Sequence, residues 1–210
     1  MFPMTPWTRR LLVANVIAFF VTVSSPGLFY QLQLNPQRIL AQPWMVFTAV
    51  TYMFLHGDIA HIAINMFVIW MFGRTLEQIW GSSRFLRFYF ACGIGGALLS
   101  FVFAYNTPVI GASAAAYGIL LAFAILFPNQ RLLLFPFFIP VKARTLVIAL
   151  VVIELIMGFS SGDGIAHFAH LGGMAAALIM LRGEYQLRRF NMALRALLAK
   201  FPVKIIMEAG

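Results

Sequence analysis

Residues 110–127 read IGASAAAYGILLAFAILF and contain no charged side chain. Five further apolar runs surround this one in the chain, at residues 11–24, 59–72, 85–105, 146–159 and 165–181. A membrane-crossing helix needs roughly 20 mainly apolar residues. In hydrocarbon each backbone amide must be bonded within its own segment, and no alternating pattern indicates a barrel. We therefore predict an all-α membrane protein, a bundle of six transmembrane helices.

The composition supports the same class of protein. The chain has 210 residues, of which 62% are hydrophobic and 10% charged, and its mean hydropathy is +0.89. A soluble domain usually carries about 25% charged residues. These values exclude a water-soluble globular domain, a disordered chain, a collagen-like chain and a coiled coil, and they leave no room for a separate soluble domain of ordinary size.

The basic residues define a side of the membrane. Of the 15 Lys and Arg residues, only Arg38 falls in a link that would face away from the others, and links 105–109 and 160–164 contain none. By the positive-inside rule the basic side is cytoplasmic, so we expect both termini there. The net charge of +9 is then explained without nucleic acid as a partner. We expect a cell membrane, and a prokaryotic plasma membrane in particular, because no targeting segment is evident.

The chain divides into a bundle at 1–183 and a basic cytoplasmic tail at 184–210. The tail mixes apolar and basic residues, which fits either an amphipathic helix on the inner leaflet or a solvated tail. The aromatic-rich link 25–42 is predicted to be a loop in the membrane interface. A cleaved signal peptide at the first run is disfavoured, because no small-x-small site follows it. Cys92 is interpreted as a small buried hydrophobic residue.

Polar side chains inside membrane helices are costly and indicate function or pairing. His61 and Asn65 are four residues apart, so they share a helix face, as do His167 and His170 at a spacing of three. The histidines lack the spacing of a metal motif, and we expect no metal and no cofactor. Glu154 interrupts the fifth apolar run; we expect it to be protonated or to face a wet interior, and assign it no role.

A serine in a membrane helix is most often a packing residue. Ser113, however, lies in a run of small residues, and so does His170: the two runs contain Gly111, Ala112, Ala114, Ala115, Ala116 and Gly118, and Gly172, Gly173, Ala175, Ala176 and Ala177. Small faces let membrane helices touch, which would bring Ser113 to His170. The histidine would take the hydroxyl proton, while His61 and Asn65 would stabilise an oxyanion. These are the parts needed for acyl transfer.

Several ordered motifs resemble those of the rhomboid family of intramembrane serine proteases. They are Phe54-Leu55-His56-Gly57-x-x-x-His61-x-x-x-Asn65-Met66, Glu77-x-x-x-Gly81-Ser82, Gly111-x-Ser113-x-x-x-Tyr117-Gly118, Phe127-Pro128-Asn129 followed by Ile139-Pro140-Val141-Lys142-Ala143-Arg144, and Ala169-His170-Leu171-Gly172-Gly173. The resemblance covers about residues 44 to 177.

The resemblance implies a serine endopeptidase that cuts single-span membrane proteins within or near their transmembrane helix. Ser113 would be the nucleophile and His170 the base of a Ser–His dyad that uses no acid, with Asp163 read as a loop residue. The oxyanion donors would be the Ser113 N–H, His61 and Asn65. Tyr117 would stack on the His170 ring, and Gly111 would support the nucleophile. His56 and His167 are expected to be structural or to line a water channel.

Three residues depart from the family pattern. Met45 follows Trp44 where family members often have Arg, Ala114 follows the serine where Gly is common, and Ala177 replaces a packing Gly. We expect the first to affect loop stability and the second to narrow the oxyanion site. Two alternatives stay open: a catalytically weak or inactive rhomboid-like protein that binds membrane proteins, and a small proton-coupled transporter using the buried histidines and Glu154. The sequence carries no signal for oligomeric state.

Overall fold

The structure is a computed structural model that describes residues 4–134, 139–160 and 166–199, without the side chains of 134 and 184–199. It forms two compact units, Met1–Leu178 and Ile179–Gly210. The elements in chain order are α1 (Pro6–Val23), α2 (Pro26–Leu32), α3 (Pro36–Ala41), η1 (Pro43–Phe47), α4 (Thr48–Thr51), η2 (Tyr52–Phe54), α5 (Ile59–Val68), the π-helical turn η3 (Ile69–Gly73), α6 (Arg74–Trp80), α7 (Ser82–Phe103), α8 (Ser113–Leu126), β1 (Arg131–Leu134), β2 (Ile139–Lys142), α9 (Ala143–Ser160) and α10 (His167–Ala199).

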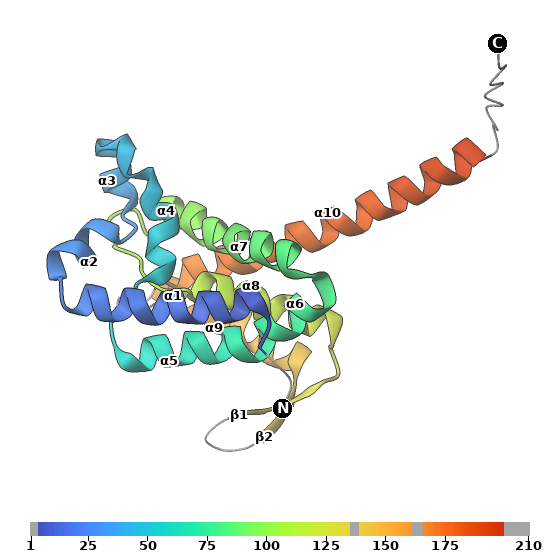
Figure 1. Cartoon of the computed structure of the whole chain (residues 1–210), viewed down its shortest axis with the longest axis horizontal. Coiled ribbons are helices and arrows are strands. Elements are labelled where there is room, and N and C mark those ends of the chain that lie inside the picture. The colour runs from blue at the N-terminus through green and yellow to red at the C-terminus, as the bar shows by residue number, and fades with distance from the viewer. Residues whose placement is uncertain (1–3, 135–138, 161–165, 200–210) are drawn as a thin grey trace, which may run out of the picture. The chain divides into compact units, whose positions relative to one another are not determined.

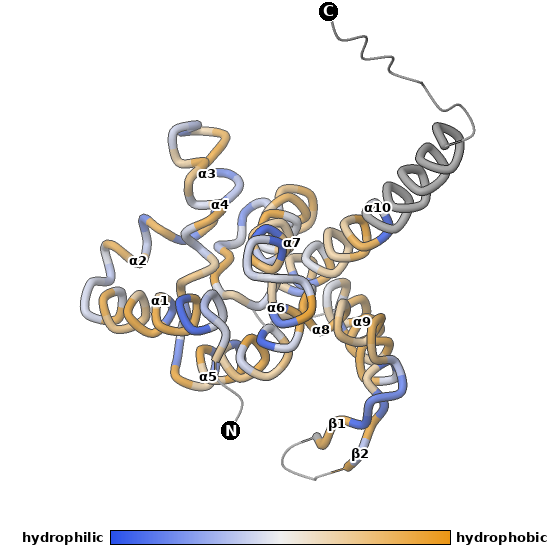
Figure 2. The backbone as a smooth tube through the Cα atoms, turned by 45° about the vertical axis from the view of Figure 1, so that its right-hand side comes forward, coloured by the Kyte–Doolittle hydropathy of each residue, from blue (hydrophilic) through white to orange (hydrophobic). Residues whose placement is uncertain are grey.

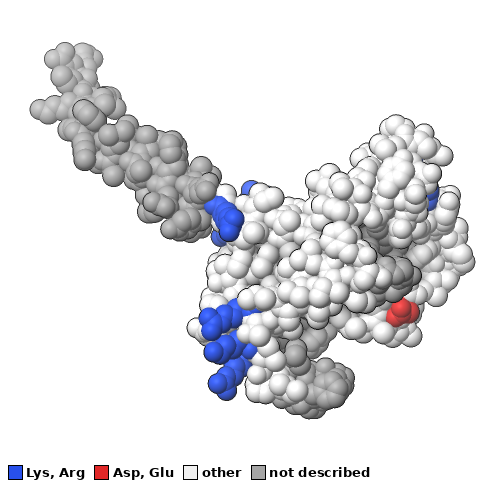
Figure 3. All heavy atoms as spheres, turned by 180° about the vertical axis from the view of Figure 1, so that it is seen from behind, with Lys and Arg blue, Asp and Glu red and all other residues white. Residues whose placement is uncertain are grey.

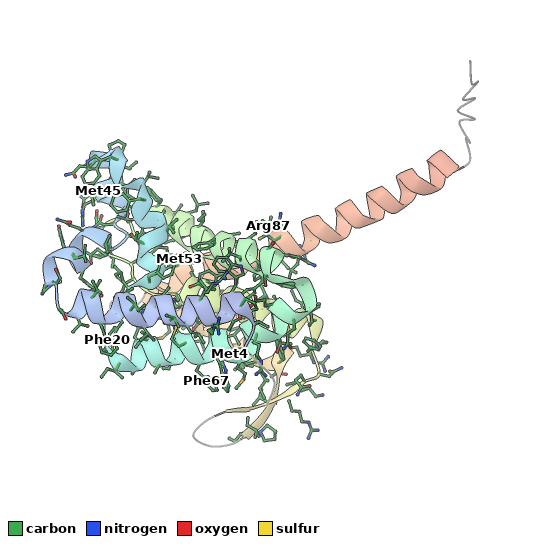
Figure 4. The ribbon with its side chains drawn as sticks, in the orientation of Figure 1. Met4, Phe20, Met45, Met53, Phe67 and Arg87 are labelled. Carbon is green, nitrogen blue, oxygen red and sulfur yellow. The ribbon has the colours of Figure 1, made fainter. Side chains whose placement is uncertain are left out.

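Within the described residues, four helices are long and apolar enough to cross a membrane: Pro6–Val23, Ile59–Trp80, Ser82–Phe103 and Ala143–Ser160. The second of these joins α5, η3 and α6 into one continuous helical segment. Apolar residues predominate along these helices, as the hydropathy colouring in Figure 2 shows. Phe20 on α1 is 65% exposed and Phe67 on α5 is 51% exposed, and Figure 4 labels both. Exposed rings on several neighbouring helices are typical of a lipid-facing surface.

Helix α8 is shorter than predicted. It has 14 residues, which at 1.5 Å each span about 21 Å, less than the roughly 30 Å of the hydrocarbon core. It begins at Ser113 and not at residue 110, because Gly111 has φ +114, outside the helical region. The described structure therefore shows a helical membrane bundle with four candidate spans, whereas the count of six crossings stays a prediction.

Helix α8 lies at the centre of the first unit, in contact with α5, α7 and α9 (Figure 1). Most of its side chains are buried, including Ala115, Ile119 and Ala122. A helix that is apolar on every side, as the charge-free run indicated, is stable only when other helices or lipid surround it. The element that carries the predicted nucleophile is thus surrounded by other helices of the bundle.

The predicted contact between the two small-residue faces is confirmed. A β carbon built on Gly173 of α10 would stand 1.9 Å from the Ala114 carbonyl oxygen of α8. On the α7 side, a β carbon on Gly118 would stand 2.5 Å from Cys92 Sγ. Cys92 is fully buried there, as the sequence predicted. Glycines at these positions let three helices approach to backbone contact.

The non-helical link before α8 is held by backbone hydrogen bonds to distant segments. Val109 and Leu34 exchange two such bonds, at 3.1 and 2.8 Å, and the Gly111 N–H donates to Tyr52 O at 2.9 Å. Irregular backbone at membrane depth is tolerated only where it is satisfied inside the protein. The residue that supplies one partner, Leu34, comes from the link predicted to be a loop. That prediction is wrong in part, because prolines at the first helical turn start α2 and α3 there.

Glu77 joins the amino end of α1 to the turn between α6 and α7 through hydrogen bonds. Its carboxylate accepts hydrogen bonds from the backbone N–H groups of Trp7 and Thr8 at 2.9 and 2.8 Å. It also accepts from Thr8 Oγ1 at 2.9 Å and from Ser82 Oγ at 2.6 Å. The turn itself requires Gly81, whose φ is +82. The Glu77 motif therefore caps a helix that lies far away in sequence.

In the first unit, basic side chains gather on one side, and an acidic side chain lies on the opposite side (Figure 3). The hairpin of β1 and β2 contributes Arg131 and Lys142, which are paired across an antiparallel ladder. This grouping is what the charge distribution along the sequence predicted. The compartment that each side faces stays a prediction.

Candidate active site

A cavity of about 550 Å³ opens among α5, α8 and α10. The predicted site residues that line it are His61, Asn65, Ser113, Tyr117 and His170. They come from three helices, so the bundle itself assembles the site. The link before α8 closes another wall through Pro108, Val109 and Ile110.

Ser113 and His170 are in direct contact. Ser113 Oγ lies 2.8 Å from His170 Nε2. Ser113 is the first residue of α8, and His170 lies in the first turn of α10, so the Ala114–Gly173 contact fixes their separation. An Nε2 atom that accepts the serine proton must be unprotonated, so the ring hydrogen of neutral His170 then lies on Nδ1.

The Tyr117 ring lies flat on the His170 ring. The ring centroids are 4.4 Å apart and the planes differ by 7°. Tyr117 is one turn after Ser113 on α8, so one helix supplies both the hydroxyl partner of His170 and the surface that fixes its ring plane. The Tyr117 hydroxyl points onward and donates a hydrogen bond to Glu154 Oε1.

Glu154, to which no role could be assigned from the sequence, lies behind His170. Its side chain comes from α9 and is 4% exposed. His167 Nδ1 lies 2.7 Å from Glu154 Oε2, and His170 Nδ1 lies 3.0 Å from the same oxygen. The distance between His170 Nδ1 and Glu154 Oε2 is that of an ion pair, although the geometry at Nδ1 is not that of a hydrogen bond. An acid therefore stands beside the serine–histidine pair, and the expectation of a dyad that uses no acid stays a prediction.

The sequence did hold one signal for this cluster. A single acidic residue in an otherwise apolar run is expensive unless donors surround it. Its donors could not be identified from spacing, because they lie on α8 and α10 while Glu154 lies on α9. Of the two alternatives for Glu154, the structure does not support a wet interior, since the carboxylate is buried against three side chains, whereas its protonation stays a prediction.

His61 and Asn65 line the same cavity from α5. Asn65 Nδ2 donates to His61 O at 3.0 Å, which holds the amide against its own helix. Gly111 leaves space between His61 and the serine, because a β carbon there would stand 2.6 Å from His61 Nε2 and 3.5 Å from Ser113 Oγ. Because Gly111 has no side chain, no atom separates the His61 imidazole from the Ser113 hydroxyl at this point of the cavity wall.

One further candidate from the sequence, His56, is not among the residues that line the cavity. His56 is 1% exposed, and its ring meets the His61 ring edge to face at 4.9 Å. Burial, followed by the neighbouring His61 ring, lowers the pKa of His56 to about 4. Asp58 begins α5 as its N-cap and accepts a hydrogen bond from the His61 N–H at 2.8 Å. Asp163 lies outside the described residues.

One group of side chains has the composition of a metal site. Glu154, His167 and His170 each offer a ligand atom, and these atoms lie within 4.8 Å of one another. A divalent ion would have to replace the contacts that already join Glu154 to the two histidines. Three such ligands leave a fourth tetrahedral position open.

The three residues that depart from the family pattern do not line the cavity. The methyl group of Ala114 faces α7, where a β carbon on Gly96 would stand 2.5 Å from it, so the expected narrowing of the oxyanion site is wrong. Met45 is buried in η1, and its sulfur accepts from Arg38 Nη2 at 3.2 Å; Figure 4 labels it at the edge of the molecule, near α3. Ala177 is fully buried in α10.

Comparison with known proteins identifies the family. The rhomboid domain model matches residues 43–185, so this chain belongs to the rhomboid family. "Rhomboid protease GluP" of Bacillus subtilis is 35% identical over 62% of this chain and 24% of its own length. "RHOMBOID-like protein 12, mitochondrial" of Arabidopsis thaliana is 29% identical over 82% of this chain and 59% of its own. "Rhomboid protein 1, mitochondrial" of Saccharomyces cerevisiae is 33% identical over 57% of this chain and 36% of its own.

The resemblance drawn from the motifs is thereby confirmed. The chain spans less than two thirds of the length of each of these three relatives. The prediction of a prokaryotic plasma membrane is contradicted, because mitochondrial rhomboid proteins match the chain. The physical reason is that charge asymmetry marks the basic side of a membrane and does not say which membrane it is.

Proposed function

We propose that this chain is an intramembrane serine endopeptidase that cuts single-span membrane proteins within or near their transmembrane helix. The observation that carries the proposal is the 2.8 Å contact between Ser113 Oγ and His170 Nε2 on the wall of a cavity within a rhomboid domain. A hydroxyl is a weak nucleophile until a neighbouring base takes its proton. The relatives' names add that at least one of them is a protease.

The proposed reaction has two stages. Ser113 Oγ attacks the scissile carbonyl carbon, its proton passes to His170 Nε2, and the carbonyl π electrons move to the oxygen. The tetrahedral intermediate collapses, the C–N bond breaks, and His170 returns the proton to the leaving amine. Water then attacks the acyl-enzyme, again losing a proton to His170, and Ser113 leaves with that proton.

The developing oxyanion would lie between α8 and α5. The first N–H groups of α8 begin at Ser113, and helix amino ends carry positive partial charge. His61 and Asn65 line the same cavity and would add side-chain donors. Each donor of this kind contributes roughly 3 kcal/mol of transition-state stabilisation in other serine hydrolases.

The short α8 supports a site below the membrane surface. We propose six crossings with both ends on the basic side: α1, the segment α5–α6, α7, α8, α9 and the first part of α10. A 14-residue α8 then ends inside the bilayer, and the non-helical link above it lets water reach Ser113. A substrate helix must unwind to expose a carbonyl there, so helix-breaking residues near the cut would raise its rate. The relatives' names favour a mitochondrial membrane as its location.

The test is cleavage of reporter transmembrane segments in liposomes, with the cut mapped by mass. We expect wild-type protein to cut, and Ser113→Ala and His170→Ala to be inactive while still folded. Ser100→Ala is the matched control, because Ser100 is a buried helix serine that bonds only its own helix at Gly96 O, 2.8 Å away. Wild-type rates in Ser113→Ala would refute the proposal.

The inactive alternative has less support, since neither Ala114 nor Met45 reaches the cavity. A fluorophosphonate probe separates the two functions without a known substrate. Labelling of the wild type but not of Ser113→Ala excludes the inactive protein. Equal labelling of both, or none of either, favours it.

A further inference from the structure

We propose that Glu154 is a positioning residue that completes a Ser113–His170–Glu154 triad. This inference rests on the proposed function, because it assigns a role within the same site. The chain of contacts runs from Ser113 Oγ to His170 Nε2 at 2.8 Å, and from His170 Nδ1 to Glu154 Oε2 at 3.0 Å. The two ring nitrogens of one imidazole thus face a nucleophile on one side and a carboxylate on the other.

The carboxylate selects the useful tautomer of the base. A neutral imidazole carries one hydrogen, and only the Nδ1–H form leaves Nε2 able to accept from Ser113. An acceptor at Nδ1 stabilises that form, and its negative charge also stabilises the imidazolium that forms after proton transfer. Glu154 does not take the proton in this scheme. In an apo structure such contacts are often misaligned and tighten when substrate binds.

The carboxylate is itself held by two further donors. Tyr117 Oη donates to Oε1, and His167 Nδ1 lies 2.7 Å from Oε2. Tyr117 also stacks on His170 with centroids 4.4 Å apart, so one side chain fixes both partners. The ring and the carboxylate can therefore shift little relative to each other. This arrangement gives His167, for which the sequence left two roles open, a contact with the acid and not with the nucleophile.

A purely structural role is the competing explanation. Glu154 joins α9 to α8 through Tyr117 and to α10 through the two histidines, so its removal could loosen the bundle. Positioning and stability are separated by measuring kcat, KM and thermal unfolding on the same variants. A matched control exists, because Glu77 is also a buried glutamate that accepts several hydrogen bonds, but it lies outside the cavity lining.

The experiment compares Glu154→Gln, Glu154→Asp and Glu77→Gln in liposomes. Glutamine keeps the shape but can present an amide N–H to Nδ1, which favours the wrong tautomer. We expect Glu154→Gln to lower kcat and the fluorophosphonate labelling rate by about 10²-fold, within the range that a general base contributes, with KM nearly unchanged. Glu154→Asp should recover part of the loss. Glu77→Gln should keep the kcat of the folded fraction.

The outcomes separate this inference from the proposed function. If labelling of the wild type does not depend on Ser113, the proposed function falls and the triad with it. If labelling depends on Ser113 but Glu154→Gln matches the wild type, only the triad falls. If Glu154→Gln does not fold, ¹⁵N NMR of His170 in the wild type decides: a hydrogen on Nδ1 supports the triad, and a hydrogen on Nε2 overturns it.

Discussion

Gly173 of α10 lies directly on the backbone carbonyl of Ala114 in α8, so close that a β carbon on Gly173 would stand 1.9 Å from that oxygen. The neighbouring residue on α8 is Ser113, and His170 is one turn before Gly173 on α10. The separation of the two helices at this point therefore sets the distance between the hydroxyl and the imidazole. A backbone carbonyl cannot rotate away as a side chain can, so this contact tolerates no added atom.

The first prediction is that Gly173→Ala destabilises the bundle and removes activity together. Overpacking in a close-packed site costs about 3 kcal/mol at the upper end of its usual range. Thermal unfolding in detergent and the cleavage rate measure the two effects. Gly27→Ala is the control, because a β carbon on Gly27 meets nothing within 4 Å. It should leave stability unchanged or raise it by up to roughly 1 kcal/mol. Equal behaviour of the two variants would show that the contact is not as tight as described.

The second prediction concerns Gly111→Ala. Its φ of +114 disfavours any β carbon, and that carbon would stand 2.6 Å from His61 Nε2. We expect a fall in kcat of at least about 10-fold, which corresponds to roughly 1.4 kcal/mol in the barrier, because the His61 ring must move off the serine. Kinetics on the folded fraction measure it. Gly57→Ala should stay active, since its β carbon would meet only Ile110 Cδ1 at an ordinary 3.6 Å. Full activity of Gly111→Ala would contradict the placement of His61.

The contact between α8 and α10 was predictable from sequence because small residues recur at local spacing within each run. The start of α8 was not, because it depends on the backbone angle of Gly111 and on Tyr52, whose carbonyl accepts the Gly111 N–H. The side chains of α8 and of α9 are apolar nearly all round each helix, so the sequence pattern does not indicate which face of either helix turns toward the site. That rotation decides whether Glu154 meets His170, and only the packing of three helices determines it.

The third prediction separates the two roles of Tyr117. Tyr117→Phe keeps a ring on His170 but removes the hydroxyl that donates to Glu154, while Tyr117→Leu removes both. A hydrogen bond to a charged group contributes about 1.5–3 kcal/mol. We expect kcat to fall roughly 10-fold or more for phenylalanine and further for leucine. Steady-state kinetics on both variants give the comparison. A phenylalanine variant with the wild-type kcat would show that the bond to Glu154 has no part in the reaction.

The fourth prediction is that Glu77 stabilises the bundle without taking part in the chemistry. Its carboxylate satisfies the N–H groups of Trp7 and Thr8 and the hydroxyl of Ser82. Glu77→Ala leaves these donors unpaired, at about 1–3 kcal/mol for each buried group. Glu77→Gln keeps one carbonyl oxygen and should lose less. Denaturant or thermal unfolding ranks the three proteins. Stability in the reverse order would mean that Glu77 does not cap α1.

The last prediction is a pH dependence of stability that arises at His56. Burial, with the His61 ring beside it, lowers the pKa of His56 from its usual 6.5 to about 4. A lowered pKa means that folding favours the neutral ring, so the stabilisation is complete above pH 6.5 and is lost as the pH falls toward 4. His56→Gln removes this titration. We therefore expect the difference in unfolding temperature between wild type and variant to be constant above neutral pH and to shift against the wild type below it. Other groups titrate in both proteins and cancel in that difference. Parallel curves from pH 7.5 to about pH 4 would show that His56 accepts a proton as easily in the folded protein as in the unfolded chain.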